Sequence, residues 1–352
     1  MNIPFHKFGS TTFAKICNSK ELMQIIDKSL LNSKTIIIKP NWVSTDSADF
    51  TDVDTLRLLF EILDCRIIIV ESYCIARALN LLKDGVSFSV GDQIVNWRWL
   101  LQGKGWNWLI RNPDWGWFRD GEHWAHLRKE EQVFLDKFGF SELFEEYNVT
   151  YLNVTEEVWN GRTANRNDIR GVVESRFHPV QVDKLYGLVP QKLYELKGST
   201  LVSLARLKMY ASFSMKNLFG MIPDPLRPWW HGIGNRMIAQ SILDINKVYH
   251  SIFNMFGICE ALKGIAYTHP HGVHQGIYSG KYNISKGKGV IVFGSNLVEQ
   301  DSILLGITDP SQRNIVKDIN QIPILLAQDE FGVVDGKLIT EAADKVKEWI
   351  SP

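Results

Sequence analysis

The stretch SMKNLFGMIPDPLRPWWHG, which begins at Ser214, places charged and polar side chains among rigid apolar bulk. Lys216 and Asn217 fall in what we expect to be a short helix capped by Ser214, and a helix N-terminus favours anions. Prolines prevent the helix from continuing and position Arg227, whose planar guanidinium suits a carboxylate or phosphate. His231 can exchange protons near neutral pH. The pattern predicts an anion-binding active-site segment, and the alternative is a proline-rich surface loop.

Further charged or amide side chains stand where expected strands end. Lys39 and Asn41 follow the first such strand, Glu71 the second, Lys208 a third and Asn296 a fourth. In open α/β sheets, ligands bind outside the carboxyl ends of the strands. We therefore expect these side chains to share one cleft, although an exposed lysine at a strand end is usually only solvated.

These residues predict an enzyme that acts on a small anionic metabolite, a carboxylate or a phosphate. His231 is the expected general acid or base, and Lys208 or Lys216, with a pKa lowered by neighbouring cations, is a candidate nucleophile. Asp301, one turn into a helix, is expected to orient a base or to accept a hydrogen bond from the substrate. The residues expected to bind the substrate are Lys39, Asn41, Asn217, Arg227 and Asn296. Isomerisation, elimination and condensation are all reactions that such side chains can catalyse.

A second constellation lies in the segment THPHGVHQG, where His269, His271 and His274 fall within six residues. Imidazoles are ligands for divalent first-row metals such as zinc or nickel, and a loop can bring them together. A metal-dependent or redox enzyme is therefore the first alternative function. A solvated loop with incidental histidines is the plainer interpretation.

Composition narrows the class of protein. The 352 residues carry 39 Lys and Arg against 39 Asp and Glu, and this neutral balance argues against a nucleic-acid partner. Four cysteines form no C-x-x-C pair, so we expect no iron–sulfur cluster, and no G-x-G-x-x-G follows a strand, so we expect no Rossmann dinucleotide site. No apolar run reaches the roughly 18 residues of a membrane span. We expect a cytoplasmic protein without a membrane partner, and its oligomeric state stays open.

The hydrophobic pattern predicts an α/β fold with a mainly parallel central sheet, flanking helices and a cleft at the strand carboxyl ends. Expected strands cover residues 34–40, 65–71, 149–154, 199–210, 251–262 and 289–296, and expected helices cover 51–63, 72–83, 140–148, 236–249, 297–307 and 337–350. Residues 160–190 are expected to form peripheral strands and loops. We interpret residues 1–350 as one α/β unit, with two lobes as the alternative.

Residues 91–128 form a tryptophan-rich insertion in this pattern. It contains seven of the twelve tryptophans, interrupted by glycines and a proline. Packing onto the main sheet is the plainest explanation of so many indoles. We expect a lid role for Trp115 and Trp117, which flank a glycine in a turn-rich setting. The second alternative function is a non-catalytic binding protein that docks through this insertion.

Several of these motifs together resemble a large family called domain of unknown function 362. The motifs are Lys39-Pro40-Asn41, LKMY, SMKNLFGMIP…R…WHG, Asp244 and GSN…D, and the resemblance runs from about residue 34 to about residue 320. It implies an α/β fold with a cleft, similar to the lactate racemases that carry a nickel-pincer cofactor. Many relatives bear ferredoxin-like cysteine motifs, which this chain lacks. Where the family has Lys-Thr-His, this chain has Lys208-Met209-Tyr210, so only the lysine carries over.

Overall fold

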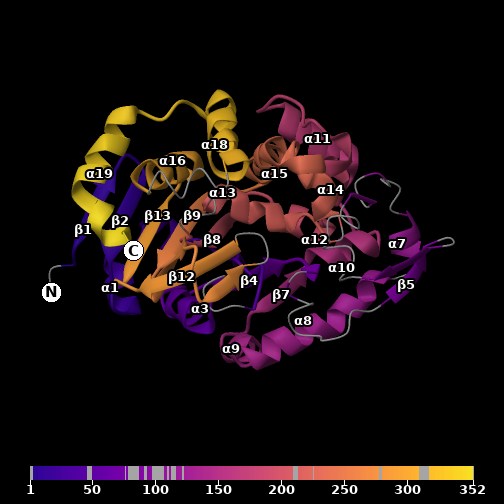
Figure 1. Ribbon diagram of the computed structural model, residues 1–352, viewed down its shortest axis with the longest axis horizontal. Coiled ribbons are helices and arrows are strands. Elements are labelled where there is room, and N and C mark those ends of the chain that lie inside the picture. The colour runs from indigo at the N-terminus through magenta and orange to yellow at the C-terminus, as the bar shows by residue number, and fades with distance from the viewer. Residues whose placement is uncertain are drawn as a thin grey trace.

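The computed structural model describes most of the chain (Figure 1). Outside the described part lie residues 1–2, 46–49, 76, 78–86, 91–92, 97–106, 109–110, 112–115, 121–122, 209–212, 225, 277–279, 309–316 and 352. Among the described helices, none is long and apolar enough to cross a membrane.

An eight-stranded sheet forms the centre, in the order β1-β2-β13-β9-β8-β3-β4-β7. Its strands are β1 (Phe5–Phe8), β2 (Thr11–Lys15), β3 (Thr35–Lys39), β4 (Arg66–Glu71), β7 (Thr150–Asn153), β8 (Thr200–Arg206), β9 (Asn254–Ala261) and β13 (Val290–Gly294). Strands β9, β8, β3, β4 and β7 run parallel, whereas β13, β2 and β1 are joined by antiparallel pairing. The mainly parallel α/β fold is therefore confirmed.

Helices cover both faces of the sheet because successive side chains of a strand point to opposite faces. Ile37 packs into one core, and Ile36 and Ile38 pack into the other. Figure 1 shows the two layers, above and below the sheet. The first layer contains α10 (Val154–Trp159), α11 (Arg166–Glu174), α13 (Ser214–Asn217), α14 (Arg227–His231), α15 (Ile238–Ile252), α16 (Leu297–Ile307), α18 (Lys317–Phe331) and α19 (Gly336–Ile350). The second contains α1 (Ser19–Ile25), α2 (Lys28–Leu31), α3 (Val53–Phe60), α8 (His126–Lys137) and α9 (Phe140–Glu146).

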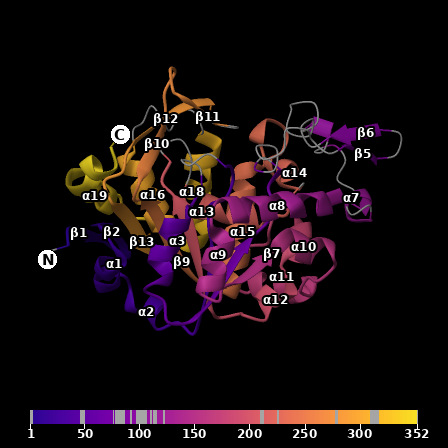
Figure 2. The same cartoon turned by 90° about the horizontal axis from the view of Figure 1, so that it is seen from below.

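Two smaller sheets and several short turns complete the described structure. One small sheet has the order β10-β12-β11 and the other pairs β5 with β6. The remaining bounds are β5 (Ser87–Val90), β6 (Gln93–Asn96), β10 (Gly264–Thr268), β11 (His274–Gly276), β12 (Gly280–Lys286), α7 (Gly116–Asp120), α12 (Gln191–Tyr194), η1 (His123–Ala125), η2 (Asp183–Leu188), η3 (Leu218–Met221) and η4 (Ile233–Asn235). Figure 2 shows β10, β11 and β12 rising from the same edge of the central sheet at which α14 lies.

The expected strands and helices are present in the described part of the chain, with corrections at the periphery; the helix expected at 72–83 lies largely outside the described residues. Residues 160–190 form no peripheral strand; they hold the nine-residue helix α11 and the turn η2. Helix α11 begins at the cap Asn165, whose side chain accepts from two backbone N–H groups, and it buries Ile169 and Val173 on one face. A spacing of four residues between buried side chains is typical of a helix, so the prediction of strands and loops for this segment was wrong.

The contact between α15 and α18 contains a half-buried imidazole, that of His250. The His250 ring lies 4.6 Å from the ring of Phe331, centroid to centroid, and its Nδ1 is 2.9 Å from the carbonyl oxygen of Asn246. Burial lowers the pKa of His250 to about 4; the Asn246 hydrogen bond opposes this shift, and Arg176 adds to it.

We therefore expect the free energy of unfolding to fall as the pH drops from 6.5 towards 4. Across that range the unfolded chain binds a proton that the folded His250 does not, so protons favour unfolding. Denaturant titrations at several pH values should show a shallower acid loss in His250→Gln than in wild type. Equal slopes in the two proteins would contradict this assignment.

Candidate functional site

A buried ion pair joins the carboxyl ends of two neighbouring parallel strands. Lys39, the last residue of β3, places its Nζ 2.5 Å from Oε2 of Glu71, the last residue of β4, and donates to the carbonyl oxygen of Pro40 at 2.7 Å. Both side chains are almost fully buried. Burial lowers the pKa of Lys39 and raises the pKa of Glu71, while their mutual attraction opposes both shifts. The energies of the charged and neutral forms of the pair are therefore brought closer together.

Gly220 closes over this ion pair. A Cβ at this position would lie 2.8 Å from Nζ of Lys39 and 3.6 Å from Oε2 of Glu71, so the pair occupies the space that a side chain would need. Ser72, the residue after β4, donates from its Oγ to the carbonyl oxygen of Gly220 at 2.5 Å. The absent side chain lets segment 218–221 lie directly against the strand ends.

Arg227 lies near the ion pair, but its guanidinium is held by protein groups. Its Nε donates to the carbonyl oxygen of Ile222 at 2.9 Å, and its Nη2 donates to the carbonyl oxygen of Tyr73 at 2.7 Å and to Ser72. Nη1 lies 3.7 Å from Oδ2 of Asp224. The expectation that this planar fork grips a substrate is therefore not supported in this conformation. Arg227 contributes positive charge and fixes the loop.

Amide side chains connect the ion pair to Lys208. Asn217 donates from Nδ2 to the main-chain oxygen of Lys39 at 2.8 Å and to Oγ of Ser203 at 3.2 Å. Its Oδ1 accepts from Asn41 at 3.3 Å, and Oδ1 of Asn41 accepts from Nζ of Lys208 at 3.0 Å. The structure therefore brings four predicted residues, Lys39, Asn41, Asn217 and Lys208, into one hydrogen-bonded chain.

His231 and Lys216 lie near this chain, on the α14 side. We call the group that also contains Lys39, Asn41, Glu71, Lys208, Asn217 and Arg227 the cluster. His231 and Lys216 are both half-buried, and Nδ1 of His231 is 3.1 Å from Oδ1 of Asn235. That oxygen can only accept, so Nδ1 carries the hydrogen and Nε2 carries the lone pair. Burial lowers the pKa of His231 to about 3; Asn235 opposes this shift, and the charges of Lys216 and Arg227 add to it. The expectation of proton exchange near neutral pH is thus corrected: the free protein holds a neutral imidazole.

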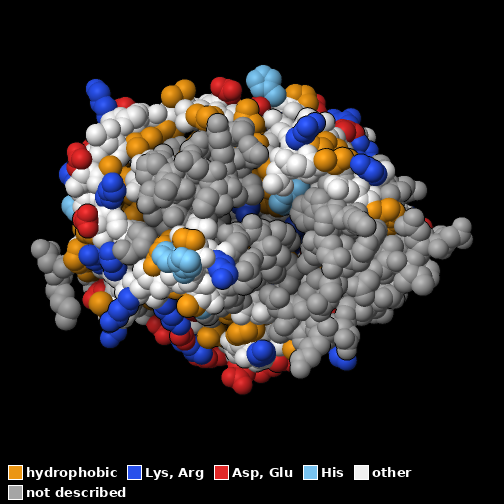
Figure 3. Space-filling model, viewed as in Figure 1, with side chains coloured by type: hydrophobic (Ala, Val, Ile, Leu, Met, Phe, Trp, Pro, Cys, Tyr) orange, Lys and Arg blue, Asp and Glu red, His pale blue; other side chains and the backbone are white. Residues whose placement is uncertain are grey.

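Figure 3 looks onto this edge of the sheet, where lysine or arginine side chains and a histidine are visible near the centre. The bridge between Lys208 and Ala266 shows that the three-stranded sheet begins directly beside the cluster. The cluster therefore lies at the carboxyl ends of β3, β4 and β8, as the strand pattern predicts.

The carboxylate of Asp301 is bound by backbone groups at the start of α13. Its carboxylate accepts hydrogen bonds from the backbone N–H groups of Ser214 at 3.0 Å and Met215 at 2.8 Å. Asp301, and not Ser214, caps α13, whose N-cap residue Phe213 makes no side-chain hydrogen bond. Burial raises the pKa of Asp301 to about 7 against the opposing backbone bonds. It positions the helix that carries Lys216 and Asn217.

Asn296 lies at the opposite edge of the sheet from Lys39. Strand β13 is antiparallel to β9, with Val290 opposite Ala261 and Gly294 opposite Gly257. Residues that follow β13 therefore emerge at the amino ends of the parallel strands. The side chain of Asn296 caps α16 by accepting from the N–H of Glu299 at 3.1 Å. A single sequence cannot show strand direction, and the expectation assumed a parallel strand.

The three histidines of the predicted metal loop do not converge on one point. His269 and His271 lie in the turn between β10 and β11, with ring centroids 6.1 Å apart, and His274 stacks on Tyr282 at 5.1 Å. Nδ1 of His269 accepts from the N–H of His271 at 3.2 Å. Across the described part of the chain, no group of three histidine, cysteine or carboxylate side chains is placed to hold a metal ion.

Sequence reasoning missed several supports of the cluster. Asp224 accepts from the N–H of Ile75 at 2.8 Å and faces Arg227. Arg77 is buried against Glu131 and the carbonyl oxygen of Trp42. Ser72 could have been found, because it follows Glu71 at a strand end. No local pattern marks Arg77, since its partner lies 54 residues away.

The predicted tryptophan lid falls largely outside the described residues. Trp115 is not described, and Trp117 is described only as part of α7. Of the others, Trp124 is buried and Trp108 is half-buried against the same core. These two indoles pack as the plainer interpretation expects, and the lid remains a prediction.

With the cluster placed, comparison with known proteins gives one family. The chain matches the family named Domain of unknown function (DUF362) over residues 119–305, more than half of its 352 residues. The chain belongs to this family. No curated protein and no solved structure matches it. Of the cluster, the matched region contains Lys208, Lys216, Asn217, Arg227 and His231, whereas Lys39, Asn41 and Glu71 precede it.

Adding one methyl group at Gly220 tests the packing of the ion pair. Gly220→Ala should lower the free energy of unfolding by about 1–3 kcal/mol, because the new Cβ overlaps Nζ and Cε of Lys39. Denaturant unfolding measures the change. Gly187→Ala is the matched control, because a Cβ there meets nothing within 4 Å. Equal stability of both variants would show that Lys39 is not held against Gly220.

Proposed function

We propose that this cluster, whose titratable members include Lys39, Glu71, Lys208, Lys216 and His231, is the active site of an enzyme that acts on a small anionic metabolite by acid/base chemistry. The observation that carries the proposal is the convergence of cationic side chains from β3, the end of β8, α13 and α14 at the carboxyl edge of a parallel sheet. Ligands of open α/β proteins bind at this edge. A carboxylate or phosphate is the ligand that such charges favour.

The cations have two kinds of role in this proposal. Lys39 and Arg227 are buried against Glu71 and Asp224, so they hold the segment and contribute a positive field. Lys216 is half-buried and adjoins the His231 imidazole, so it is the side chain best placed to contact a bound anion. On the β8 side, the ammonium of Lys208 is held by Asn41, so it contributes positive charge to the cluster. Fixed charges of this kind stabilise negative charge that develops during a reaction.

His231 is the proposed base, and its basicity depends on the substrate. Burial disfavours the imidazolium most, and the positive charges of Lys216 and Arg227 add to this effect, so the free protein keeps a neutral ring. A bound anion offsets those charges and raises the pKa of the ring towards neutrality. Nε2 can then take a proton from the carbon beside a substrate carboxylate, and the electron pair remains on the substrate, stabilised by Lys216. The cluster therefore favours isomerisation or elimination over redox chemistry.

The pKa of His231 should rise when a small anion binds. An opposite charge at about 4–6 Å shifts a pKa by about 1–3 units, so phosphate or acetate should shift the NMR titration of this ring upwards by at least one unit. His178, whose side chain is 85% exposed, serves as the internal control. Lys216→Ala should reduce the anion-dependent rise. An unchanged His231 titration at saturating phosphate and acetate would contradict the proposal.

A further inference from the structure

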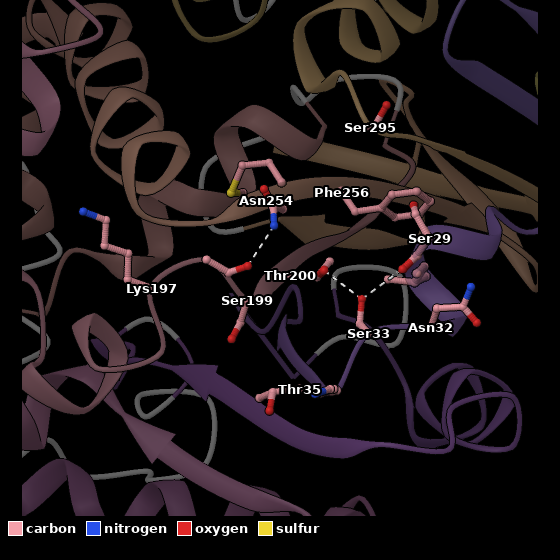
Figure 4. A pocket seen from close by; sticks show the side chains of 14 residues that line it. Ser29, Asn32, Ser33, Thr35, Lys197, Ser199, Thr200, Asn254, Phe256 and Ser295 are labelled. Atoms are coloured by element: carbon pink, nitrogen blue, oxygen red, sulfur yellow. Dashed lines mark hydrogen bonds between the residues drawn. The ribbon is translucent and has the colours of Figure 1, made fainter.

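Two cavities in the described part of the chain lie outside the cluster. The larger, of about 670 Å³, lies at the amino ends of β3, β8 and β9 (Figure 4). Polar groups of its wall bond to one another or to the backbone. Oγ of Ser33 is 2.9 Å from Oγ1 of Thr200, and Asn254 donates to the carbonyl oxygen of Gly198 at 2.8 Å. These bonds indicate no particular class of ligand.

The smaller cavity, of about 380 Å³, lies over the outer edge of β7. All four residues of this strand line it, together with residues of α8 from one helical layer and of α10 from the other. A cavity bordered by both layers lies beside the strand, because the sheet separates the two layers. Figure 1 shows β7, α8 and α10 together, away from β1 at the other end of the sheet.

Strand β7 is paired on one side only among the described strands. It runs parallel to β4 and stands last in the strand order. An edge strand of this kind presents backbone N–H and C=O groups to a chain that lies beside it. Thr150 is exposed and Tyr151 is half-buried, so the first half of the strand is the accessible part of this edge. An extended peptide can therefore add to β7 as a further strand, which is a common mode of peptide recognition.

Ion pairs beside this edge turn their positive members outward. Glu157 accepts from Arg162 at 3.1 Å and lies 3.3 Å from Nζ of Lys192. The Glu157 side chain is 7% exposed, whereas those of Arg162 and Lys192 are 47% and 63% exposed. Arg128, which is 60% exposed, repeats this arrangement against Glu156, which is 18% exposed. The carboxylates are recessed, so an approaching chain meets guanidinium and ammonium groups first.

These cations keep hydrogen-bond donors for a ligand. Arg128 and Arg162 use Nε and Nη2 in their bonds, and Nη1 of each makes no hydrogen bond within the described part of the chain. Lys192 contacts Glu157 and has three N–H donors in all. Charge-assisted hydrogen bonds to carboxylates are the strongest that such groups form. The rim of the cavity therefore favours the side chains of aspartate and glutamate on a bound chain.

Two other occupants fit this edge less well. A second copy of the chain, paired edge to edge through β7, brings its own Arg128, Arg162 and Lys192 towards these, and like charges repel. The two ends of the chain pack together at β1, where the rings of His6 and Trp349 lie 5.3 Å apart, centroid to centroid. Strands β1 and β7 are at opposite ends of the sheet, so neither end of the chain lies near β7.

We propose that the outer edge of β7 binds an extended, acidic segment of a partner protein. The segment pairs through its backbone with β7, and its carboxylates contact Arg128, Arg162 and Lys192. This interaction surface includes none of the residues of the cluster and does not rest on the proposed function.

Fluorescence anisotropy with a labelled octapeptide of alternating glutamate and valine tests this surface. One comparison peptide has lysine in place of each glutamate, and the other carries methyl groups on its backbone nitrogens, which prevent strand pairing. The acidic peptide should bind at least tenfold more tightly than either. The double variant Arg128→Gln/Lys192→Gln should weaken this binding about tenfold, since two attractive charges are removed. It leaves Glu157 paired with Arg162.

The matched control is Lys129→Gln/Lys137→Gln, which removes two exposed charges of α8 outside the cavity and should bind like wild type. Circular dichroism checks that each variant is folded. Hydrogen exchange locates the peptide, because the amide groups of Thr150–Asn153 should exchange more slowly in the complex.

Binding that is lost in Arg128→Gln/Lys192→Gln and kept in the control, with protection of β7, supports the proposal. Equal affinity for the acidic and lysine peptides, or protection elsewhere with β7 unchanged, overturns it. Absence of saturable binding at millimolar peptide also overturns it, and the charged side chains then only shield the edge from other strands. Sedimentation that shows a dimer strengthened in Arg128→Gln/Lys192→Gln overturns it in favour of a second copy.

Discussion

The Lys39–Glu71 ion pair is the constraint on which the candidate site depends. Two opposite charges at the ends of adjacent strands are removed from water, with Nζ and Oε2 2.5 Å apart. Such a pair adds little net stability, but removing one partner leaves a buried charge and costs about 3–5 kcal/mol. Because the pair fills the space beside Gly220, it fixes segment 218–221 against the sheet. The path of that segment decides where Arg227 and His231 come to lie.

Sequence reasoning found the parts of this site that depend on local pattern. The β-branched runs before Lys39 and Glu71 identify strands β3 and β4, and their connection through α3 makes them parallel neighbours. The site therefore falls at the predicted edge of the sheet. Lys208 and Asn217 were also identified, because a cation or amide beside a strand end or a broken helix is visible in one sequence.

The rest depends on long-range contacts that a single sequence does not reveal. Asp301 caps α13 from 87 residues away, so its carboxylate is committed to backbone N–H groups. Arg227 binds the segment after β4 from 155 residues away, which occupies its guanidinium. Asn296 is displaced to the other edge because β13 runs antiparallel. In each case the residue type correctly indicated a hydrogen-bonding side chain. The tertiary structure determined that its partner is another part of the protein and not a ligand.

The two edges of the sheet differ in how their polar groups are satisfied. At the carboxyl edge the charges are buried and coupled, and the pKa of His231 responds to them. At the amino edge, hydroxyl and amide groups line a cavity, and some of them bond to each other or to the backbone. Buried, coupled charges are suited to acid/base catalysis, because the binding of an anion changes their protonation.

Anomalous diffraction from crystals soaked in selenate tests the central claim most directly. Selenate is a tetrahedral oxyanion that resembles phosphate in shape and charge, and its selenium gives an anomalous signal that identifies the anion. The account predicts an anomalous peak at the carboxyl edge of the sheet, within hydrogen-bonding distance of Lys216 and next to His231. Well-diffracting soaked crystals with anomalous peaks elsewhere and none at this cluster would contradict it.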